Sequence, residues 1–173
     1  QGESFPGPRE LGILFSPLHG VAASSVVPLL SSVGFKQVEV YPPHASQDGD
    51  FPNVPDHVAN PENTAIFDAL VEHAKESGQE IVLVTDPDGD RMGCAAPLTL
   101  EEGSPWQVFN GNQLSSLLAD FVLEKRSQEG HLDAHHYIIK TLVTTELMRR
   151  IADSYGVRTC GQLLVGFKWI GGT

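Results

Sequence analysis

Short apolar runs alternate along the chain with segments whose apolar residues recur every three or four positions. The apolar runs predict strands, because a strand buried in a sheet needs about four to eight apolar or β-branched residues between turn residues. The predicted strands cover residues 11–15, 37–41, 81–85, 92–98, 106–109 and 137–142.

Four segments with helical periodicity lie between these strands. The first helix is expected to begin near Ser25 and to end near Val33, because Pro28 is tolerated only in the first turn of a helix. The second is expected to begin at Asn60, which can cap a helix, with Pro61 in the first helical position. The predicted helices cover residues 25–33, 60–77, 114–122 and 146–155.

The alternation of strands and helices predicts the fold class. Gly34 and Gly78 follow the first two helices and are expected to end them, because glycine adopts the left-handed conformation of a helix C-terminus. Strands separated by helices of this length favour βαβ units. We therefore expect an α/β fold of two three-layer units with mainly parallel mixed sheets, the second unit being incomplete.

The charge is distributed unevenly and marks a domain boundary. The 173 residues carry a net charge of −11. Residues 1–103 hold 4 Lys or Arg and 16 Asp or Glu, whereas residues 104–173 hold 7 and 6. The change coincides with a polar, breaker-rich stretch at residues 101–105, so two domains are expected, 1–103 and 104–173. The acidic first domain argues against nucleic-acid binding, because it repels phosphate backbones.

Composition also bears on the compartment. No apolar run approaches the ~18 residues that a membrane span needs, so we expect no contact with a membrane. No signal peptide is visible, and a cytoplasmic location is expected. Cys94 and Cys160 have neither metal-binding nor disulfide-framework spacing, and we expect both to be reduced, buried thiols.

The most informative segment is an acidic loop directly after the strand at 81–85. It carries Asp86, Asp88 and Asp90, followed by Arg91. Alternate side chains on a tight turn can converge, and three carboxylates at close range repel one another unless a cation lies between them. Carboxylate oxygens favour Mg²⁺ or Ca²⁺, and ligands of open α/β sheets bind beyond the carboxyl ends of the strands. The loop therefore predicts a cation site beside an arginine suited to holding a phosphate.

Three other interpretations of this loop compete with the cation site. It is compatible with an inert surface turn, because Asp-Pro and Asp-Gly are ordinary turn sequences. A calcium loop of the EF-hand type fails, because Arg91 stands where glycine is required and Pro97 where the bidentate glutamate belongs. A dehalogenase-type phosphotransferase would use Asp86 as nucleophile and Asp88 as acid and base. In that class, however, a hydroxyl residue stands in place of Asp90, and the motif normally opens its domain.

Six motifs follow one another along most of the chain: FSPLHG, DGDFPN with ANPEN, TDPDGDRMG, GNQLSSLLADFVL, KTLVTTELMRRIA and LLVGFKWIGG. In this order they resemble the α-D-phosphohexomutase superfamily, the phosphoglucomutases and phosphomannomutases. The resemblance implies that residues 1–103 correspond to the second of four domains and residues 104–173 to a truncated third. Domains 1 and 4, which carry the phosphoserine and grip the phosphate, would be missing partners.

The resemblance also implies an activity and roles for individual residues. Members interconvert hexose 1-phosphates and 6-phosphates through a phosphoserine and a bisphosphate intermediate. By motif, the three aspartates of the acidic loop would bind Mg²⁺ and Arg91 would steady the phosphate of the phosphoserine. Gly166, Phe167 and Lys168 would lie on the loop that faces the hexose phosphate. Without the phosphoserine loop the 173 residues alone are expected to be inactive and to bind Mg²⁺ weakly. A metal- or phosphosugar-binding module without chemistry is the non-enzymatic alternative.

Several other polar residues are expected to be structural. His19 follows a strand and is expected to hydrogen-bond to loop backbone. His135 and His136 are expected on the surface, and Lys140 is expected to be a solvated charge on a strand. Trp169 is expected either to stack on a sugar or to be buried.

Overall fold

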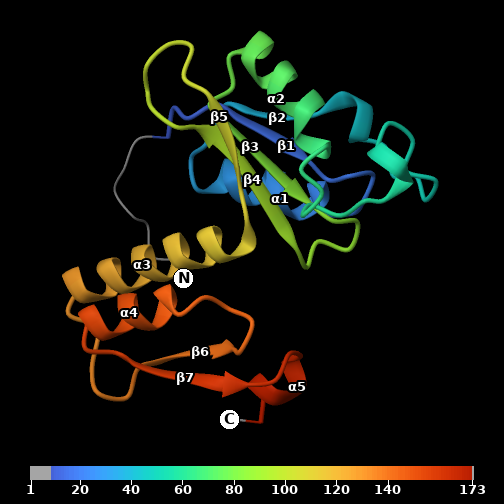
Figure 1. Cartoon of the computed structure of the whole chain (residues 1–173). Coiled ribbons are helices and arrows are strands. Elements are labelled where there is room, and N and C mark those ends of the chain that lie inside the picture. Colours follow the sequence, from blue (N-terminus) through green and yellow to red (C-terminus); the bar gives the residue numbers. More distant parts are fainter. Residues whose placement is uncertain (1–8, 173) are drawn as a thin grey trace. The chain divides into compact units, whose positions relative to one another are not determined.

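The computed structural model describes residues 9–172, which divide between Asn110 and Gly111 into two compact units (Figure 1). The boundary expected near residue 103 lies instead in a hairpin of the first unit. The strand at 106–109 pairs antiparallel with the strand before it, with Pro97 opposite Trp106. The hydrogen bonds of this hairpin keep the last strand in the first sheet, and the division falls after it.

The first unit is built on a mixed five-stranded sheet with the order β2-β1-β3-β4-β5. Its strands are β1 (Ile13–Ser16), β2 (Val38–Val40), β3 (Ile81–Thr85), β4 (Met92–Pro97) and β5 (Trp106–Phe109). The pairs β1–β2 and β1–β3 are parallel, whereas β3–β4 and β4–β5 are antiparallel. The prediction of an α/β fold with a mixed sheet is therefore confirmed.

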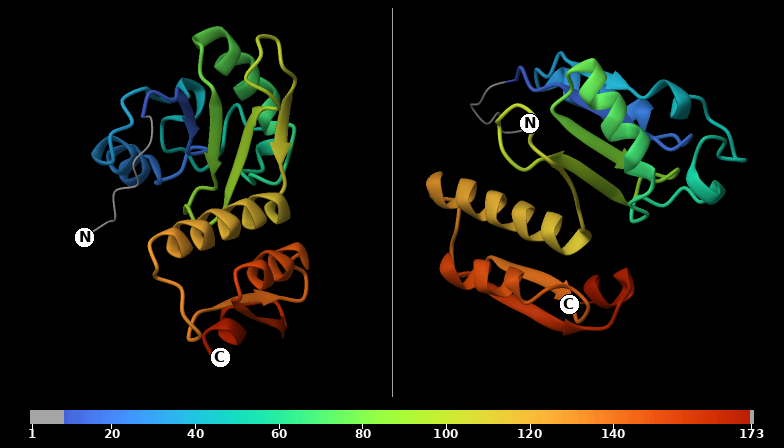
Figure 2. Two further views of the ribbon diagram at one scale, coloured as in Figure 1. Left: turned by 90° about the vertical axis from the view of Figure 1, so that its left-hand side faces the viewer. Right: turned by 45° about the horizontal axis from the view of Figure 1, so that its top comes forward.

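Two helices connect the parallel strands of this sheet. The connections β1–α1–β2 and β2–α2–β3 run in opposite directions across the sheet, so right-handed crossovers place α1 (Ala23–Ser32) and α2 (Ile66–Ser77) on opposite faces (Figure 2). The core lies beneath α2 and contains residues that are fully inaccessible to solvent, Leu14, Leu18, Leu70, Ala74, Val82, Val84 and Ala95.

Helix α1 begins earlier than the sequence predicts. Its first residue is Ala23 rather than Ser25, so Pro28 lies inside the helix instead of in its first turn. Proline has no backbone N–H, so the carbonyl of Ser24 lacks its hydrogen-bond donor within the helix. Both residues lie on the exposed side of α1, where water can donate to that carbonyl. The C-terminus agrees with the sequence: Gly34 has φ 101°, and its amide and that of Phe35 close the last turn.

Helix α2 begins later than the sequence predicts, at Ile66 rather than at Asn60. The Oδ1 atom of Asn60 accepts a hydrogen bond from the Glu62 amide at 3.1 Å, and that of Asn63 accepts one from the Ala65 amide at 3.1 Å. These local side-chain turns take the place of the first helical turns. Gly78 ends the helix at φ 73°, as predicted.

The second unit contains a two-stranded parallel sheet in the part of the chain that the structure describes. Its elements are α3 (Gly111–Gln128), β6 (Tyr137–Thr141), α4 (Leu147–Ser154), β7 (Arg158–Leu163) and α5 (Phe167–Ile170). Strands β6 and β7 with α4 form a βαβ unit, and α3 packs against α4. No helix among the described residues combines the length and the apolar character that a membrane span requires.

Candidate metal centre

The acidic loop leaves the sheet at the carboxyl end of β3. Val82 and Val84 anchor the strand in the core, and Asp86 follows directly. The amide of Asp86 donates to the Arg91 carbonyl at 3.3 Å, and the amide of Gly89 donates to the Asp86 carbonyl at 3.1 Å. Gly89 has φ 77°, a conformation that favours glycine. The segment therefore closes into a tight turn at the sheet edge where α/β proteins bind ligands.

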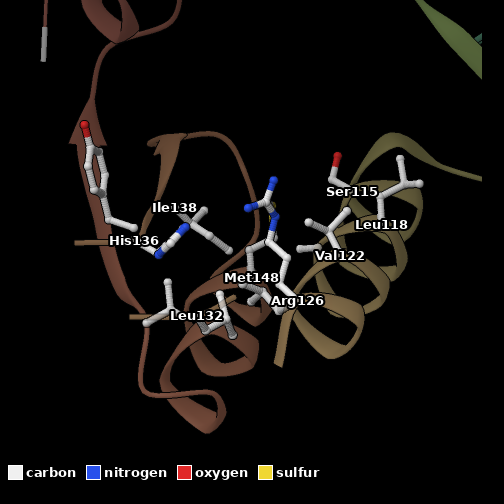
Figure 3. Close-up of a pocket in the computed structure, with 12 residues that line it drawn as sticks. Ser115, Leu118, Val122, Arg126, Leu132, His136, Ile138 and Met148 are labelled. Atoms are coloured by element: carbon white, nitrogen blue, oxygen red, sulfur yellow. The ribbon is translucent and has the colours of Figure 1, made fainter. Parts of the chain in front are cut away.

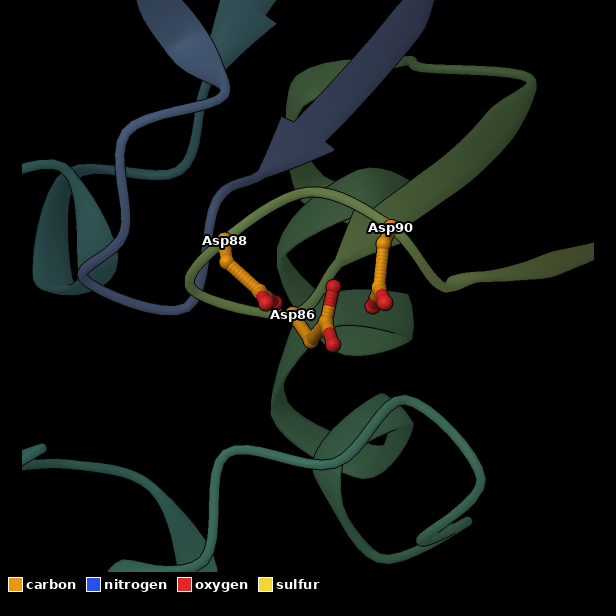
Figure 4. Close-up of side chains that lie close together, drawn as sticks. All are labelled: Asp86, Asp88 and Asp90. Carbon is orange, nitrogen blue, oxygen red and sulfur yellow. The ribbon is translucent and has the colours of Figure 1, made fainter. Parts of the chain in front are cut away.

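The turn brings the three predicted carboxylates together (Figure 4). One oxygen from each of Asp86, Asp88 and Asp90 lies within 4.8 Å of the other two. Asp86 is completely buried, whereas Asp88 and Asp90 are exposed. Among the described residues, this is the one group of three or more potential metal-binding side chains that converges in this way.

Arg91 binds the buried carboxylate from two directions. Its backbone amide donates to Oδ1 of Asp86 at 3.0 Å, and its Nε donates to Oδ2 at 2.7 Å. Burial by itself raises the pKa of Asp86, but these hydrogen bonds and the guanidinium charge more than offset burial and lower the pKa. Asp86 is therefore ionised inside the fold.

Asp90 shows the opposite effect. Its hydrogen bond with the Asp86 carboxyl group raises its pKa, and the charges of Asp88 and Asp86 raise the pKa further. One arginine therefore does not offset the repulsion among three carboxylates. A small divalent cation fits this site, because the available donors are hard carboxylate oxygens and the charge of the ion would relieve the repulsion.

The turn after β1, which contains Gly20 and Val21, packs against the acidic loop. The amide of Val21 donates to the Pro87 carbonyl at 2.9 Å. A Cβ atom on Gly20 would lie only 2.2 Å from the Cα of Pro87. Glycine at this position therefore allows the turn after β1 to pack directly against the backbone of the acidic loop.

His19 holds the neighbouring long loop rather than the metal site. Its Nδ1 lies 2.8 Å from the Ser46 carbonyl and its Nε2 lies 2.6 Å from the Pro52 carbonyl. This confirms the predicted structural role. Buried His44 lies beside it, with ring centroids 5.3 Å apart, and contacts the Ser16 hydroxyl at 2.9 Å. Burial lowers the pKa of His44.

Sequence reasoning missed one residue of the site, Asn60. Its Oδ1 accepts a hydrogen bond from Nη1 of Arg91 at 3.3 Å. The two residues are 31 positions apart, and Asn60 follows a long loop whose path no sequence pattern predicts. Asn60 is followed by proline in the sequence, and this pattern is typical of the start of a helix. It does not indicate a contact with Arg91.

Gly166, Phe167 and Lys168 belong to the second unit, at the start of α5. Gly166 has φ 123°, and the Phe167 side chain is 82% exposed. The Nζ atom of Lys168 lies 5.3 Å from the centre of the Trp169 ring. Trp169 is also exposed, so burial does not explain this aromatic residue.

Lys140, in contrast, is not the solvated charge that its strand position predicts. Its side chain is 1% exposed, and its Nζ lies 2.6 Å from Oε1 of Glu146. The same Nζ donates to the Thr144 carbonyl at 2.9 Å, and Arg149 donates to the other Glu146 oxygen at 2.7 Å. Lys140 is therefore a structural cation that holds the turn between β6 and α4. His135 lies on the surface, as predicted, whereas His136 is half-buried and its Nδ1 lies 2.9 Å from Oδ1 of Asp133.

The second unit also contains an open, largely apolar pocket of roughly 540 Å³ (Figure 3). Leu118 and Val122 of α3 line one side, and Ile138 of β6 lines another. Arg126 contributes the one fixed positive charge of the lining. Ser115, His136 and Tyr137 are the other polar residues of the lining.

Both cysteines are free thiols. Cys94 is buried, as predicted, and burial raises its pKa to about 11. Cys160 is only partly buried.

Comparison with known proteins connects this site to one family. Residues 6–98 match the model of phosphoglucomutase/phosphomannomutase α/β/α domain II, and residues 110–173 match the model of domain III. A phosphomannomutase of Mycoplasmoides pirum is 29% identical over 163 residues, which are 94% of this chain and 28% of the relative. A phosphoglucomutase of Staphylococcus aureus strain N315 is 33% identical over 163 residues, 93% of this chain and 27% of the relative.

Solved structures agree on the fold. A phosphoglucomutase/phosphomannomutase family protein of Burkholderia thailandensis superposes with a TM-score of 0.72 at 21% identity, covering 95% of this chain and 31% of that protein. A protein of Thermus thermophilus described as a putative phosphomannomutase superposes with a TM-score of 0.66 at 22% identity, covering 94% and 33%. The two consecutive domain matches span most of the sequence, and the chain belongs to the phosphoglucomutase/phosphomannomutase family.

Proposed function

We propose that this chain is the second domain and part of the third domain of a phosphohexomutase that interconverts hexose 1-phosphates and 6-phosphates. The observation that carries the proposal is the convergence of Asp86, Asp88 and Asp90 within 4.8 Å at the carboxyl end of β3, in a chain of this family. The chain spans 27–28% of the length of the two curated relatives described above. Domains 1 and 4 of the parent protein would supply the phosphoserine and the main phosphate grip.

The three aspartates would hold Mg²⁺, which when bound supplies Lewis-acid stabilisation of a phosphoryl group in transfer. Asp86 is fixed by burial and by Arg91, so one carboxylate is already positioned before a cation arrives. Asp88 and Asp90 are exposed and would complete the set from the surface of the turn. No nucleophile is needed from the loop itself, because transfer would start from the phosphoserine of domain 1.

Arg91 would bind the phosphate of that phosphoserine. Its side chain is 52% exposed, so part of the guanidinium faces solvent although Nε is bound to Asp86. Guanidinium groups recognise phosphate oxygens through several parallel hydrogen bonds and keep their charge at any physiological pH. Arg91 therefore combines an anchor on the metal loop with an accessible face for an anion.

Gly166, Phe167 and Lys168 would contact the hexose phosphate from the third domain. The exposed Phe167 ring offers an apolar face to a sugar, and the Lys168 ammonium offers a cation to its phosphate. The parent enzyme is expected to work in the cytoplasm.

The dehalogenase-type alternative is less well supported. The dehalogenase-type motif carries a hydroxyl residue where Asp90 stands in this chain, and the chain matches phosphoglucomutase/phosphomannomutase domains over most of its length. Beryllofluoride trapping on Asp86 tests this alternative directly.

The experiment that tests the proposal is an assay of the complete coding sequence that contains this segment, with glucose 1-phosphate or mannose 1-phosphate, a bisphosphate primer and Mg²⁺. We expect turnover that is lost in Asp88→Asn and retained in Asp68→Asn, an exposed acidic residue of α2 with the same charge change. The 173-residue chain alone should show no turnover. Activity of the chain alone, or full activity of Asp88→Asn, would contradict the proposal.

A further inference from the structure

We propose that Asn60 is a positioning residue, whose amide oxygen holds the guanidinium of Arg91 at the acidic loop. Oδ1 of Asn60 accepts hydrogen bonds from Nη1 of Arg91 at 3.3 Å and from the Glu62 amide at 3.1 Å. The contact itself stands on geometry alone. Its consequence for anion binding rests on the proposed function of Arg91.

The backbone of Asn60 is fixed on both sides. Its amide donates to the Val58 carbonyl at 2.9 Å, and its carbonyl accepts from the Asn63 amide at 2.9 Å. Pro61 follows and is buried, and its ring restricts the backbone further. The Asn60 side chain is therefore presented from a rigid turn, at little entropic cost when it binds Arg91.

Gly93 allows this turn to approach β4, the strand that begins directly after Arg91. A Cβ atom on Gly93 would lie 2.8 Å from the Pro61 carbonyl oxygen, 2.8 Å from Cζ of Phe67 and 3.2 Å from Cβ of Pro61. Any side chain at this position would push the turn away from β4. The absence of a side chain two residues after Arg91 therefore permits the close approach of Asn60.

The chemistry of the two anchors on Arg91 differs. Nε binds the carboxylate of Asp86, whose charge offsets that of the guanidinium, whereas Nη1 binds the neutral amide of Asn60. A carboxylate that also serves a divalent cation is a weaker acceptor for Nε, because the cation withdraws electron density from it. The Asn60 amide is unaffected by that competition. It would keep the guanidinium in place and leave its positive charge available to a phosphate.

The direct test is the side-chain ¹⁵N spectrum of Arg91 in this chain. The Asn60 contact restrains rotation of the guanidinium about the Nε–Cζ bond and protects the Nη1 protons from exchange. In Asn60→Ala we expect faster rotation and exchange at Arg91. Asn63→Ala is the matched control, because Oδ1 of Asn63 makes the equivalent turn to the Ala65 amide at 3.1 Å. Its spectrum should match that of the wild type.

A second measurement, the affinity for inorganic phosphate at millimolar Mg²⁺, tests the consequence. The Asn60 bond holds the guanidinium but does not touch the anion, so its loss in Asn60→Ala should weaken phosphate binding about 3- to 10-fold, as for an ordinary hydrogen bond. Asn63→Ala should stay within about 2-fold of the wild type, the range expected where no bond to the arginine is lost. Asn60→Asp should retain restrained rotation of Arg91 but weaken phosphate binding, because its carboxylate would offset the charge.

The two readouts separate the possible failures. Unchanged Arg91 rotation in Asn60→Ala, or an equal change in Asn63→Ala, would overturn the positioning role. If the wild-type chain binds no phosphate while the Arg91 signal responds to Asn60→Ala as expected, the positioning role stands and the proposed anion-binding function of Arg91 fails.

Discussion

The packing of the turn after β1 against the acidic loop makes Gly20 the most informative position for a single substitution. In Gly20→Ala the new Cβ would lie 2.2, 2.3 and 2.6 Å from the Cα, carbonyl oxygen and carbonyl carbon of Pro87. All three atoms belong to the backbone, so no side-chain rotation can relieve the overlap. The two segments must separate.

The size of the effect follows from these distances. Carbon atoms make normal contact at about 3.5 Å, so the two backbones must move apart by about 1.3 Å. Overpacking of this kind costs about 1–3 kcal/mol. The movement also stretches the 2.9 Å hydrogen bond from Val21 to Pro87, which contributes about 0.5–1.5 kcal/mol. With both contributions, Gly20→Ala should lower the free energy of unfolding of the first unit by roughly 1.5–4.5 kcal/mol.

The assay is urea unfolding followed by the fluorescence of Trp106, in a Trp169→Phe background so that the signal reports the first unit alone. The matched control is Gly49→Ala, because a Cβ on Gly49 would meet no atom within 4 Å. The control should change the free energy of unfolding by less than about 0.5 kcal/mol. A Gly20→Ala variant as stable as the control would refute the close approach.

Two further predictions concern the second unit and the thiols. Lys140 and Arg149 lower the pKa of Glu146 to about 2, so this contribution to stability is present above about pH 4.5 and is lost as the pH falls towards 2. Glu146→Gln should therefore lower the Tm of the second unit at pH 7 and flatten its acid dependence in calorimetry, and an unchanged acid profile would contradict the pairing. Cys94 is buried with a pKa near 11, so Ellman's reagent at pH 8 should modify Cys160 first, with Cys94 reacting only on unfolding. Equal rates in the Cys94→Ala and Cys160→Ala variants would show that Cys94 is accessible in the folded chain.

The features that sequence predicts well here are those set by local backbone chemistry or by continuous apolar patterns. Gly34 and Gly78 end their helices because only glycine adopts the left-handed conformation at little cost. Ile66 and Phe67 are buried because the apolar positions of α2 repeat at the helical period. The three aspartates converge because their spacing and the glycine between them produce a tight turn.

The features that sequence missed depend on contacts between distant segments or on competing local interactions. Asn60 and Asn63 both have side chains suited to capping a helix. Each instead accepts a hydrogen bond from the amide two residues later and forms a local turn, so α2 begins only at Ile66. Composition predicts a boundary at residue 103, whereas the hydrogen bonds between β4 and β5 keep the chain in the first unit as far as Asn110.

The surroundings of Lys140 and Arg91 also differ from the sequence prediction. A charged residue and its partner are often far apart in the sequence, so no local pattern identifies the pair. Lys140 occupies a strand position that usually faces water, yet Glu146 makes burial possible by pairing with it. The contact of Asn60 with Arg91 spans 31 positions and depends on Gly93, where the missing side chain lets two segments meet. Neither arrangement has a sequence pattern of its own.

The proposed function depends most on binding of a divalent cation by the acidic loop. The most direct measurement is the ¹H–¹⁵N spectrum of this chain during titration with Mn²⁺, a paramagnetic substitute for Mg²⁺. We predict broadening centred on the amides of residues 86 and 88–91, reversed by excess Mg²⁺, abolished in Asp88→Asn and retained in Asp68→Asn. Broadening spread over the acidic surface, or equal broadening in Asp88→Asn, would contradict the claim.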